Sequence, residues 1–357
     1  MKLDTKNRYA FADGLRGLAA LWVVLYHLLH GDHVTQLSNF IGHSLTAILF
    51  EYGNLGVPVF FVLSGFVMAV TTNSKTMGLS QSSKFMLRRL VRLSPPYYFS
   101  ILLSLIAIYV KLRFVDNSIE FPNFANIISH FFYLQEFLGY KEINIVFWTL
   151  CYEIQFYLVF SLILFLASNF NQKSLGHYLV IVGFTLLGLL WFIFHQYAGA
   201  LDAFVNSHKL FLRYWYAFCA GALAGWAITR THHAFQTYAI AFYVLTLLAG
   251  ILKSDPFAIT AGITALSIHI ALQLNKMDSW LNFRYLQLLG LISYSLYLIH
   301  NILLGIVARV VRKFLSSGVL ADIVVLITCL AACLLFAYWM YVIIEKPVIR
   351  MSQKIKY

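Results

Sequence analysis

The chain has 357 residues, of which 61% are hydrophobic and only 11% charged, and its formal net charge is +12. A soluble domain usually has about a quarter of its residues charged, so this composition excludes an ordinary soluble protein and predicts a single membrane bundle. In a membrane protein an excess of Lys and Arg is typical of cytoplasmic loops, which argues against nucleic-acid binding.

Apolar segments long enough to cross a membrane recur along the whole chain. About 20 apolar residues span the hydrocarbon as a helix, and unpaired backbone groups are too costly in lipid for other structures. The sequence therefore predicts an all-α polytopic bundle with a single transmembrane domain over 1–357, a core at about 10–347 and no appended soluble domain. The ten candidate spans are about 14–30, 50–72, 95–115, 147–168, 177–196, 210–228, 236–252, 256–274, 285–308 and 319–344.

The distribution of basic residues predicts the orientation of this bundle. With the N-terminus placed inside, most of the 26 Lys and Arg residues fall in inside loops and termini. The cluster at 309–313 is the exception, and a shifted ninth span would explain it. We expect both termini in the cytoplasm and a multi-pass protein of the inner (plasma) membrane. The cysteines lie in apolar runs and are expected to be reduced packing residues: Cys151, Cys219, Cys329 and Cys333.

The first predicted span contains an arginine and a histidine within its apolar run. Arg16 and His27 are eleven residues apart, about 16 Å along a helix and close to three full turns, so both face the same side. Burying ionisable residues is costly, which makes them candidate functional residues. We interpret them as lining one groove, with Arg16 near the cytoplasmic end and His27 in the outer half. The alternative is that Arg16 snorkels to the interface and His27 is a satisfied interior histidine.

A cluster of arginines precedes the third span. Arg88 and Arg92 are four residues apart and share a helical face with Arg89 beside them. Arginine suits bidentate contacts with phosphate, so this cluster is a candidate site for a phosphorylated ligand. The alternative is a plain positive-inside anchor. Pro95 and Pro96 are expected to end the preceding turn and begin the span.

The fourth span contains a carboxylate near its outer end. Glu153 is expected at a depth similar to His27, where a carboxylate usually has a partner. A His–Glu pair at one depth is the ordinary arrangement for a general base that is oriented and charged by a carboxylate. The alternative is a structural pair with Arg213 or with a tyrosine. Cys151 is interpreted as a packing residue, because no cation is evident beside it to form a thiolate.

A polar stripe marks the ninth span. Ser293, Tyr297 and His300 recur at helical spacing and should face the bundle interior. They could bind an acceptor or support His27, or they could simply make hydrogen bonds between helices. The spacing of the histidines predicts no metal site.

Six short patterns follow one another from Asp13 to Pro347, and each is modest alone. They are Arg16 with His27, Phe60 to Phe66 (FFVLSGF), Arg88 to Pro95 (RRLVRLSP), Trp148 to Glu153 (WTLCYE), Ser293 to His300 (SYSLYLIH) and Glu345 to Pro347 (EKP). In this order they resemble the signature of the acyltransferase 3 family of membrane proteins. Thr149 and Cys151 stand where that family usually has serines, so no serine role is expected at those two positions.

The resemblance implies a membrane O-acetyltransferase with acetyl-CoA as the usual acyl donor and no metal. It implies an acceptor hydroxyl on a cell-surface glycan or glycolipid, such as lipopolysaccharide O-antigen, capsule or exopolysaccharide. Some members carry an extracytoplasmic hydrolase-like domain after the last span. This chain ends at Tyr357, so a stand-alone enzyme is expected. The expected partners are the lipid bilayer and the glycan, with no nucleic acid.

The resemblance also implies roles for the candidate residues. His27, oriented by Glu153, would remove the acceptor's proton or briefly carry the acyl group, and both routes remain open. Arg16 is expected to be a catalytic residue with His27 and Glu153, and also to hold the donor together with Arg88, Arg89 and Arg92. The residues expected to contact the acceptor or support His27 are Ser64, Trp148, Tyr297 and His300.

Two other classes of protein would also place polar residues in such spans. A transporter or export protein for an acylated or envelope small molecule often has inverted repeats, and no repeat is evident here. A receptor or assembly scaffold would need no buried His and Glu at one depth. Failure of the purified protein to bind CoA would favour these two classes.

Overall fold

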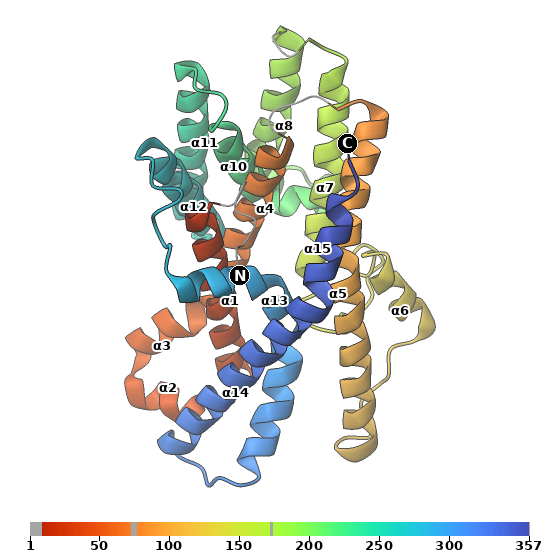
Figure 1. Ribbon diagram of the computed structural model, residues 1–357, viewed down its shortest axis with the longest axis vertical. Coiled ribbons are helices and arrows are strands. Elements are labelled where there is room, and N and C mark those ends of the chain that lie inside the picture. Colours follow the sequence, from red (N-terminus) through yellow and green to blue (C-terminus); the bar gives the residue numbers. More distant parts are fainter. Residues whose placement is uncertain (1–8, 73–76, 172–173, 357) are drawn as a thin grey trace.

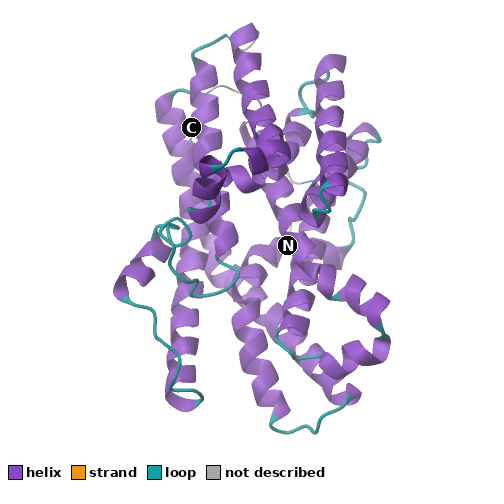
Figure 2. Ribbon diagram, turned by 180° about the vertical axis from the view of Figure 1, so that it is seen from behind, coloured by secondary structure: helices purple, strands orange, loops and turns teal. Residues whose placement is uncertain are grey.

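The protein is described by a computed structural model that covers residues 9–72, 77–171 and 174–356. Within these ranges the secondary structure consists of helices and their connections, without a strand (Figure 2). Some basic residues behind the orientation prediction lie outside them, namely Lys2, Lys6, Arg8, Lys75 and Lys173. The prediction of a polytopic helical membrane bundle is confirmed.

Nine segments of the described chain are long and apolar enough to cross a membrane (Figure 1). Five are single helices close to their predicted bounds: α1 (Ala10–His30), α7 (Trp148–Ser168), α11 (His233–Leu252), α12 (Pro256–Gln273) and α13 (Arg284–Arg312). A sixth, α5 (Leu79–Phe114), is longer than predicted. The other three segments consist of more than one helical element. His43–Thr72 contains α3 (His43–Leu49) and α4 (Gly56–Thr72), and Leu175–Tyr197 contains α8 (Leu175–Phe194) and a short 3₁₀ turn. Val319–Gln353 contains α14 (Val319–Met340) and α15 (Lys346–Gln353). Short helices in the connections are α2 (Thr35–Ile41), α6 (Phe124–Phe131) and α9 (Ala200–Ser207).

The predicted sixth span, 210–228, is a shorter element than a spanning helix. It consists of the 3₁₀ turn Phe211–Tyr214 and the 12-residue helix α10 (Trp215–Trp226), every residue of which is buried. Just after α10, the Arg230 guanidinium lies 3.2 Å from Nε2 of His177 in the first turn of α8. The chain therefore returns to the side of the bundle from which α8 starts, as the ten predicted spans require. Which side is cytoplasmic stays a prediction.

Close helix contact explains why α10 is so short and so buried. A Cβ atom added at Gly221 would lie 1.8 Å from the carbonyl oxygen of Val62 in α4, and one added at Gly65 would lie 2.0 Å from that of Phe218. Small residues let two backbones approach closely, and such contacts drive helix association in membranes. Helix α4 therefore packs directly on α10, which fixes the helix that carries Phe60 and Ser64.

We expect Gly221→Ala to destabilise the protein by about 1–3 kcal/mol or more, because the new methyl group overlaps the α4 backbone. The matched control is Gly183→Ala in α8, where nothing lies within 4 Å of the added atom and helix propensity improves. Thermal unfolding followed by size-exclusion chromatography measures both. Equal stability of the two variants would contradict this account of the α4–α10 contact.

The structure corrects the expectation for the two prolines. Pro95 and Pro96 lie inside the continuous helix α5 and do not begin it. Proline removes backbone hydrogen bonds, which membrane helices tolerate when a neighbouring helix compensates. Here the Tyr294 hydroxyl of α13 donates a hydrogen bond of 2.8 Å to the carbonyl of Leu93, just before the prolines. Helix α5 is thereby attached to α13 beside Arg92.

Candidate functional site

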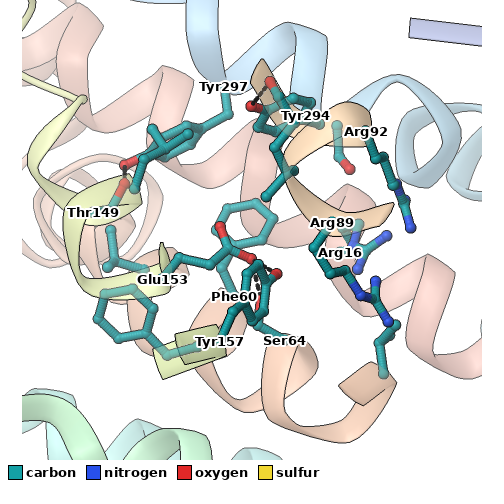
Figure 3. Close-up of a pocket in the computed structure, with 16 residues that line it drawn as sticks. Arg16, Phe60, Ser64, Arg89, Arg92, Thr149, Glu153, Tyr157, Tyr294 and Tyr297 are labelled. Atoms are coloured by element: carbon teal, nitrogen blue, oxygen red, sulfur yellow. Dashed lines mark hydrogen bonds between the residues drawn. The ribbon is translucent and has the colours of Figure 1, made fainter. Parts of the chain in front are cut away.

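Five helices converge on one interior pocket (Figure 3). Each helix contributes at least one predicted site residue to its lining. These residues are Arg16 from α1, Ser64 from α4, Arg89 and Arg92 from α5, Glu153 from α7 and Tyr297 from α13. Arg16 and Tyr297 are 281 positions apart in the chain, yet both line this pocket, so the tertiary fold brings distant residues together. We call this hollow the arginine pocket.

The three arginines gather on one side of the arginine pocket (Figure 3). Arg89 is buried, and its Nη2 donates to the Thr71 hydroxyl at 3.0 Å. Its guanidinium carbon lies 5.4 Å from the centre of the Phe85 ring and 5.9 Å from that of Tyr157, as in cation–π contacts. Glu153 is the one carboxylate among the residues that line the pocket. The lining therefore carries excess positive charge, which favours an anionic ligand.

Glu153 faces the arginines from α7 (Figure 3). Its Oε1 accepts a hydrogen bond of 2.6 Å from the Ser64 hydroxyl and a second one from the Tyr157 hydroxyl. Tyr157 lies four residues after Glu153 and so on the same helical face. This agrees with the structural alternative of a tyrosine partner for Glu153. The i+4 spacing was a usable signal for Tyr157, which the sequence reasoning did not include among the site residues.

His27 has a different partner from the one expected. Its Nδ1 lies 2.9 Å from the Val23 carbonyl oxygen and 3.3 Å from Nε2 of His300. In turn, Nδ1 of His300 lies 2.8 Å from the Tyr297 carbonyl oxygen. Carbonyl oxygens only accept hydrogen bonds, so both rings carry their proton on Nδ1 when neutral. Nε2 of His27 then has a free lone pair, as a general base requires.

Within the part of the chain that the structure describes, Glu153 and His27 make no hydrogen bond or ion pair with each other, because Glu153 is held by Ser64 and His27 by His300. The physical reason is helix packing: α1 lies directly against α13, whereas α7 presents Glu153 to α4. His27 and His300 also lie outside the set of residues that line the arginine pocket. The role of Glu153 as the orienting carboxylate is therefore not supported by its contacts.

Two further predicted residues lie away from the pocket lining. Arg88 is half-buried on α5 and is not among the lining residues described. Trp148 packs in an aromatic group, with ring centres 6.3 Å from Phe61 and 5.8 Å from Tyr214. Trp148 thus supports the wall that carries Phe61, which does line the pocket.

The histidine pair lies beyond one end of the arginine pocket. On α13, His300 follows the pocket residue Tyr297 by one turn, and their ring centres are 5.8 Å apart. On α1, His27 follows the pocket residue Arg16 by eleven residues, which corresponds to about 16 Å along the axis. A long, flexible ligand anchored at the arginines could therefore present its far end to His27.

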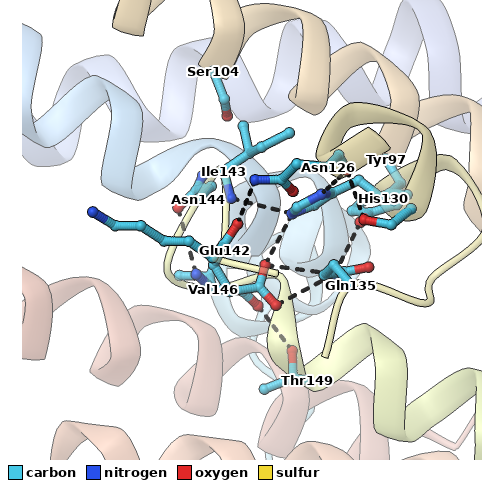
Figure 4. Close-up of polar contacts among 12 residues, drawn as sticks. Tyr97, Ser104, Asn126, His130, Gln135, Glu142, Ile143, Asn144, Val146 and Thr149 are labelled. Atoms are coloured by element: carbon cyan, nitrogen blue, oxygen red, sulfur yellow. Dashed lines mark hydrogen bonds and ion pairs between the residues drawn. The ribbon is translucent and has the colours of Figure 1, made fainter. Parts of the chain in front are cut away.

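A polar network in the connection between α6 and α7 was missed by the sequence reasoning (Figure 4). His130 is fully buried, with Nδ1 2.9 Å from the Asn126 carbonyl oxygen and Nε2 accepting from the Ile143 N–H at 3.1 Å. Glu142 places Oε2 3.3 Å from Nε2 of His130 and receives a hydrogen bond of 3.3 Å from the Gln135 amide. This network fixes the connection as a folded unit against the bundle.

The same connection is tied to the helix of the histidine pair. The amide of Asn301 donates to Oδ1 of Asn144 at 3.2 Å, and Asn301 is the residue after His300. The amide of Asn144 lies 3.4 Å from the Leu298 carbonyl oxygen. Two residues of the polar stripe also make hydrogen bonds to other helices, Tyr297 to the Thr149 hydroxyl at 2.8 Å and His300 to His27 at 3.3 Å, which agrees with the interpretation of interhelical hydrogen bonding.

The buried carboxyl of this network predicts a pH dependence of stability. Burial raises the pKa of Glu142 to about 7, against the opposing effect of the neighbouring His130 ring. The ordinary value is 4.5, so between pH 4.5 and 7 the unfolded chain releases a proton that the folded protein keeps. Stability should therefore fall as pH rises through this window and level off above it.

We expect Glu142→Gln to flatten this fall, which thermal unfolding between pH 5 and 8 would measure. The matched control is Glu120→Gln, an exposed carboxyl in the preceding connection between α5 and α6, which should keep the wild-type slope. An unchanged slope in Glu142→Gln would assign the pH dependence to another group.

The chain was compared with known proteins. The model of a family described as an acyltransferase domain matches residues 9–342. The O-acetyltransferase OatA of Staphylococcus aureus (strain NCTC 8325 / PS 47) is 28% identical over 188 residues, which are 50% of this chain and 28% of OatA. The putative O-acetyltransferase SACOL0978 of S. aureus (strain COL) is 28% identical over 197 residues, which are 51% of this chain and 29% of that protein. The aligned region thus spans less than a third of these relatives, and no solved structure matches the chain.

Proposed function

We propose, from the premise that this chain belongs to the acyltransferase 3 family, that it moves an acetyl group from cytoplasmic acetyl-CoA to a hydroxyl of a cell-surface glycan at the outer side of the inner membrane. Membership of the family makes the chain an acyltransferase, and the proposal adds the donor, the acceptor and the site. The observation that carries it is the arginine pocket, with the His27–His300 pair beyond its end.

The donor is proposed to bind in the arginine pocket. CoA carries phosphates at one end and the acyl thioester at the other end of a flexible arm. Arg16, Arg89 and Arg92 supply cationic donors for the phosphates, and Ser64 with Glu153 lines the facing wall. The arm would run along α1 and bring the thioester to His27. Arg88 would attract the donor from the cytoplasmic surface without lining the pocket.

His27 is proposed as the general base. Its free Nε2 takes the proton of the acceptor hydroxyl while the oxygen attacks the thioester carbon, so that a C–O bond forms and the C–S bond breaks. The same nitrogen then gives the proton to the departing sulfur, which leaves as CoA thiol. His300 holds the Nδ1 proton of His27 in place and so acts as a positioning residue, and Tyr297 positions His300 through its carbonyl.

The test is transfer of radiolabelled acetyl from acetyl-CoA into envelope glycan by membranes that contain the chain, with CoA binding to the purified protein measured in parallel. We expect label in the glycan and saturable CoA binding. Absence of both would overturn the proposal and favour a transporter or scaffold. A labelled protein trapped in a single turnover without acceptor would identify an acyl-histidine intermediate, and its absence would favour direct transfer.

The expected independence from metals remains a prediction, although among the described residues no group of three or more His, Cys, Asp or Glu could hold an ion. We expect activity to survive dialysis against EDTA, because the thioester is already an activated acyl donor. A loss that added Zn²⁺ or Mg²⁺ restores would contradict this.

A further inference from the structure

A second hollow lies at the C-terminal end of α1, next to His27. It is lined by residues of α1, of the following connection and of the 3₁₀ turn Glu51–Leu55. Its lining residues include Tyr26, His30, Asp32, Thr35, Glu51 and Asn54. We call it the outer groove. The ring centres of Tyr26 and His27 are 5.0 Å apart. His27 therefore lies beside the outer groove on α1, eleven residues from Arg16, which lines the arginine pocket.

The groups in the outer groove suit a sugar ring. Tyr26 and His30 stack with ring centres 3.9 Å apart and planes at 27°, which places two aromatic rings in the wall of the groove, where a ring face outside the stack could contact the C–H face of a sugar. Glu51 and Asp32 offer carboxylate acceptors, and Asn54 and Thr35 both donate and accept, so together they match hydroxyl groups. Two carboxylates in one groove also repel an anionic ring.

Contacts on both sides hold this groove in one shape. A Cβ atom added at Gly53 would lie 2.2 Å from the Trp22 carbonyl oxygen, so the turn that carries Glu51 and Asn54 is pressed against α1. The Trp22 indole N–H also donates to the Ile48 carbonyl at 2.9 Å. A binding site on fixed elements loses little entropy when it is occupied.

The other wall is attached to α13 and α14 through a buried ion pair. Asp322 is fully buried, and its Oδ2 accepts from the Leu37 N–H at 2.8 Å. Arg312 pairs with Asp322 and donates to the His33 carbonyl at 3.0 Å. The connection that carries Asp32 and Thr35 is thus held to α13 at His33 and to α14 at Leu37.

We propose that the outer groove binds the acceptor sugar unit and selects a ring without an acidic substituent. The inference rests on the proposed function, because the groove can serve an acceptor only if His27 is the base beside it. It names the substrate class, a neutral or amine-bearing sugar, and the residues that choose it. Glu51 and Asp32 bind its hydroxyls and exclude uronic acids.

The experiment uses the full chain in lipid nanodiscs loaded with CoA. Saturation-transfer NMR measures the binding of methyl β-glucoside and of methyl β-glucuronide, two rings that differ only at C6, which carries a hydroxymethyl group in the first and a carboxylate in the second. We expect the glucoside to bind at least tenfold more tightly than the glucuronide. Glu51→Gln, alone or with Asp32→Asn, should weaken glucoside binding about tenfold and remove most of the preference, because a charge-assisted hydrogen bond and a repulsion are both lost. Glu120→Gln, outside the groove, should match the wild type.

Acetyl transfer to envelope glycan, measured on the same variants, separates this inference from the proposed function. If the wild type transfers acetyl but binds both rings equally, or if Glu51→Gln changes neither binding nor the acceptor KM, the inference is wrong and the function stands. If the glucoside binds with the expected preference but no acetyl is transferred and CoA does not bind, the groove stands as a sugar site and the proposed function falls.

Discussion

Replacing His27 by Gln is expected to lower kcat for acetyl transfer by about 10²–10⁴-fold, the usual contribution of a positioned acid–base group. Gln keeps a polar side chain of similar size at the end of α1 but cannot take a proton. CoA should bind with unchanged affinity, because His27 does not line the arginine pocket and lies about 16 Å along the helix from Arg16, which is expected to bind phosphate. Radiolabelled transfer gives kcat, and calorimetry with CoA gives the Kd.

Two variants make this result specific. His43→Gln changes an exposed histidine at the start of α3 and should behave like the wild type. His300→Ala should reduce kcat less than His27→Gln and alter the pH profile, because it removes the partner that fixes the His27 tautomer and leaves the base in place. Full activity in His27→Gln would show that the base is another residue, and the positioning role of His300 would then fail with it.

The sequence identified Arg16, Arg92, Glu153 and Tyr297 as candidate site residues, because polar and ionisable residues in or next to spans tend to face the bundle interior. Their expected depths did not predict that they meet. Arg92 was placed before the third span, and Glu153 was placed in the outer half with His27, about 16 Å from Arg16. All four line the same pocket.

Depth does not determine which side chains touch. Glu153 and His27 were expected to pair because both were placed in the outer half of the membrane, but Glu153 lines the arginine pocket with Arg16, and the rotation and neighbour of each helix decide its contacts. Helix α1 packs on α13 and so gives His27 the imidazole of His300, whereas α7 turns Glu153 toward Ser64. Such choices depend on the packing of whole helices, which single-sequence patterns do not encode.

The sequence patterns also failed to predict the structure of the connections and of the irregular helices. His130 and Glu142 are twelve residues apart, outside any apolar run, and they meet only because α6 and its following turns fold back on α5. Pro95 indicated a helix start, but α5 continues through both prolines, and the Tyr294 hydroxyl of α13 contacts the carbonyl of Leu93 just before them. In each case a tertiary contact outweighs a local preference.

The second large effect is expected at the donor end of the site. Arg92→Gln should raise the Kd for acetyl-CoA about 10–100-fold, because a charge-assisted hydrogen bond to phosphate contributes about 1.5–3 kcal/mol and each 1.4 kcal/mol is a factor of ten. Arg92 lines the arginine pocket, and the Tyr294–Leu93 hydrogen bond beside it attaches this part of α5 to α13. Removing the charge should therefore change binding with little change in shape. Calorimetric titration of the purified protein gives both Kd values.

The comparison of two donors makes the test decisive. S-acetylpantetheine carries the same thioester and arm but lacks the nucleotide phosphates, so its affinity should be equal for wild type and Arg92→Gln. Arg350→Gln, an exposed arginine of α15, should leave both donors unaffected. Added salt should weaken acetyl-CoA binding to the wild type more than to Arg92→Gln, since one screened charge pair is missing in the variant. An equal loss of affinity for both donors would mean that Arg92 shapes the pocket and does not bind phosphate, and the proposed path of the donor from the arginines to His27 would then have to be redrawn.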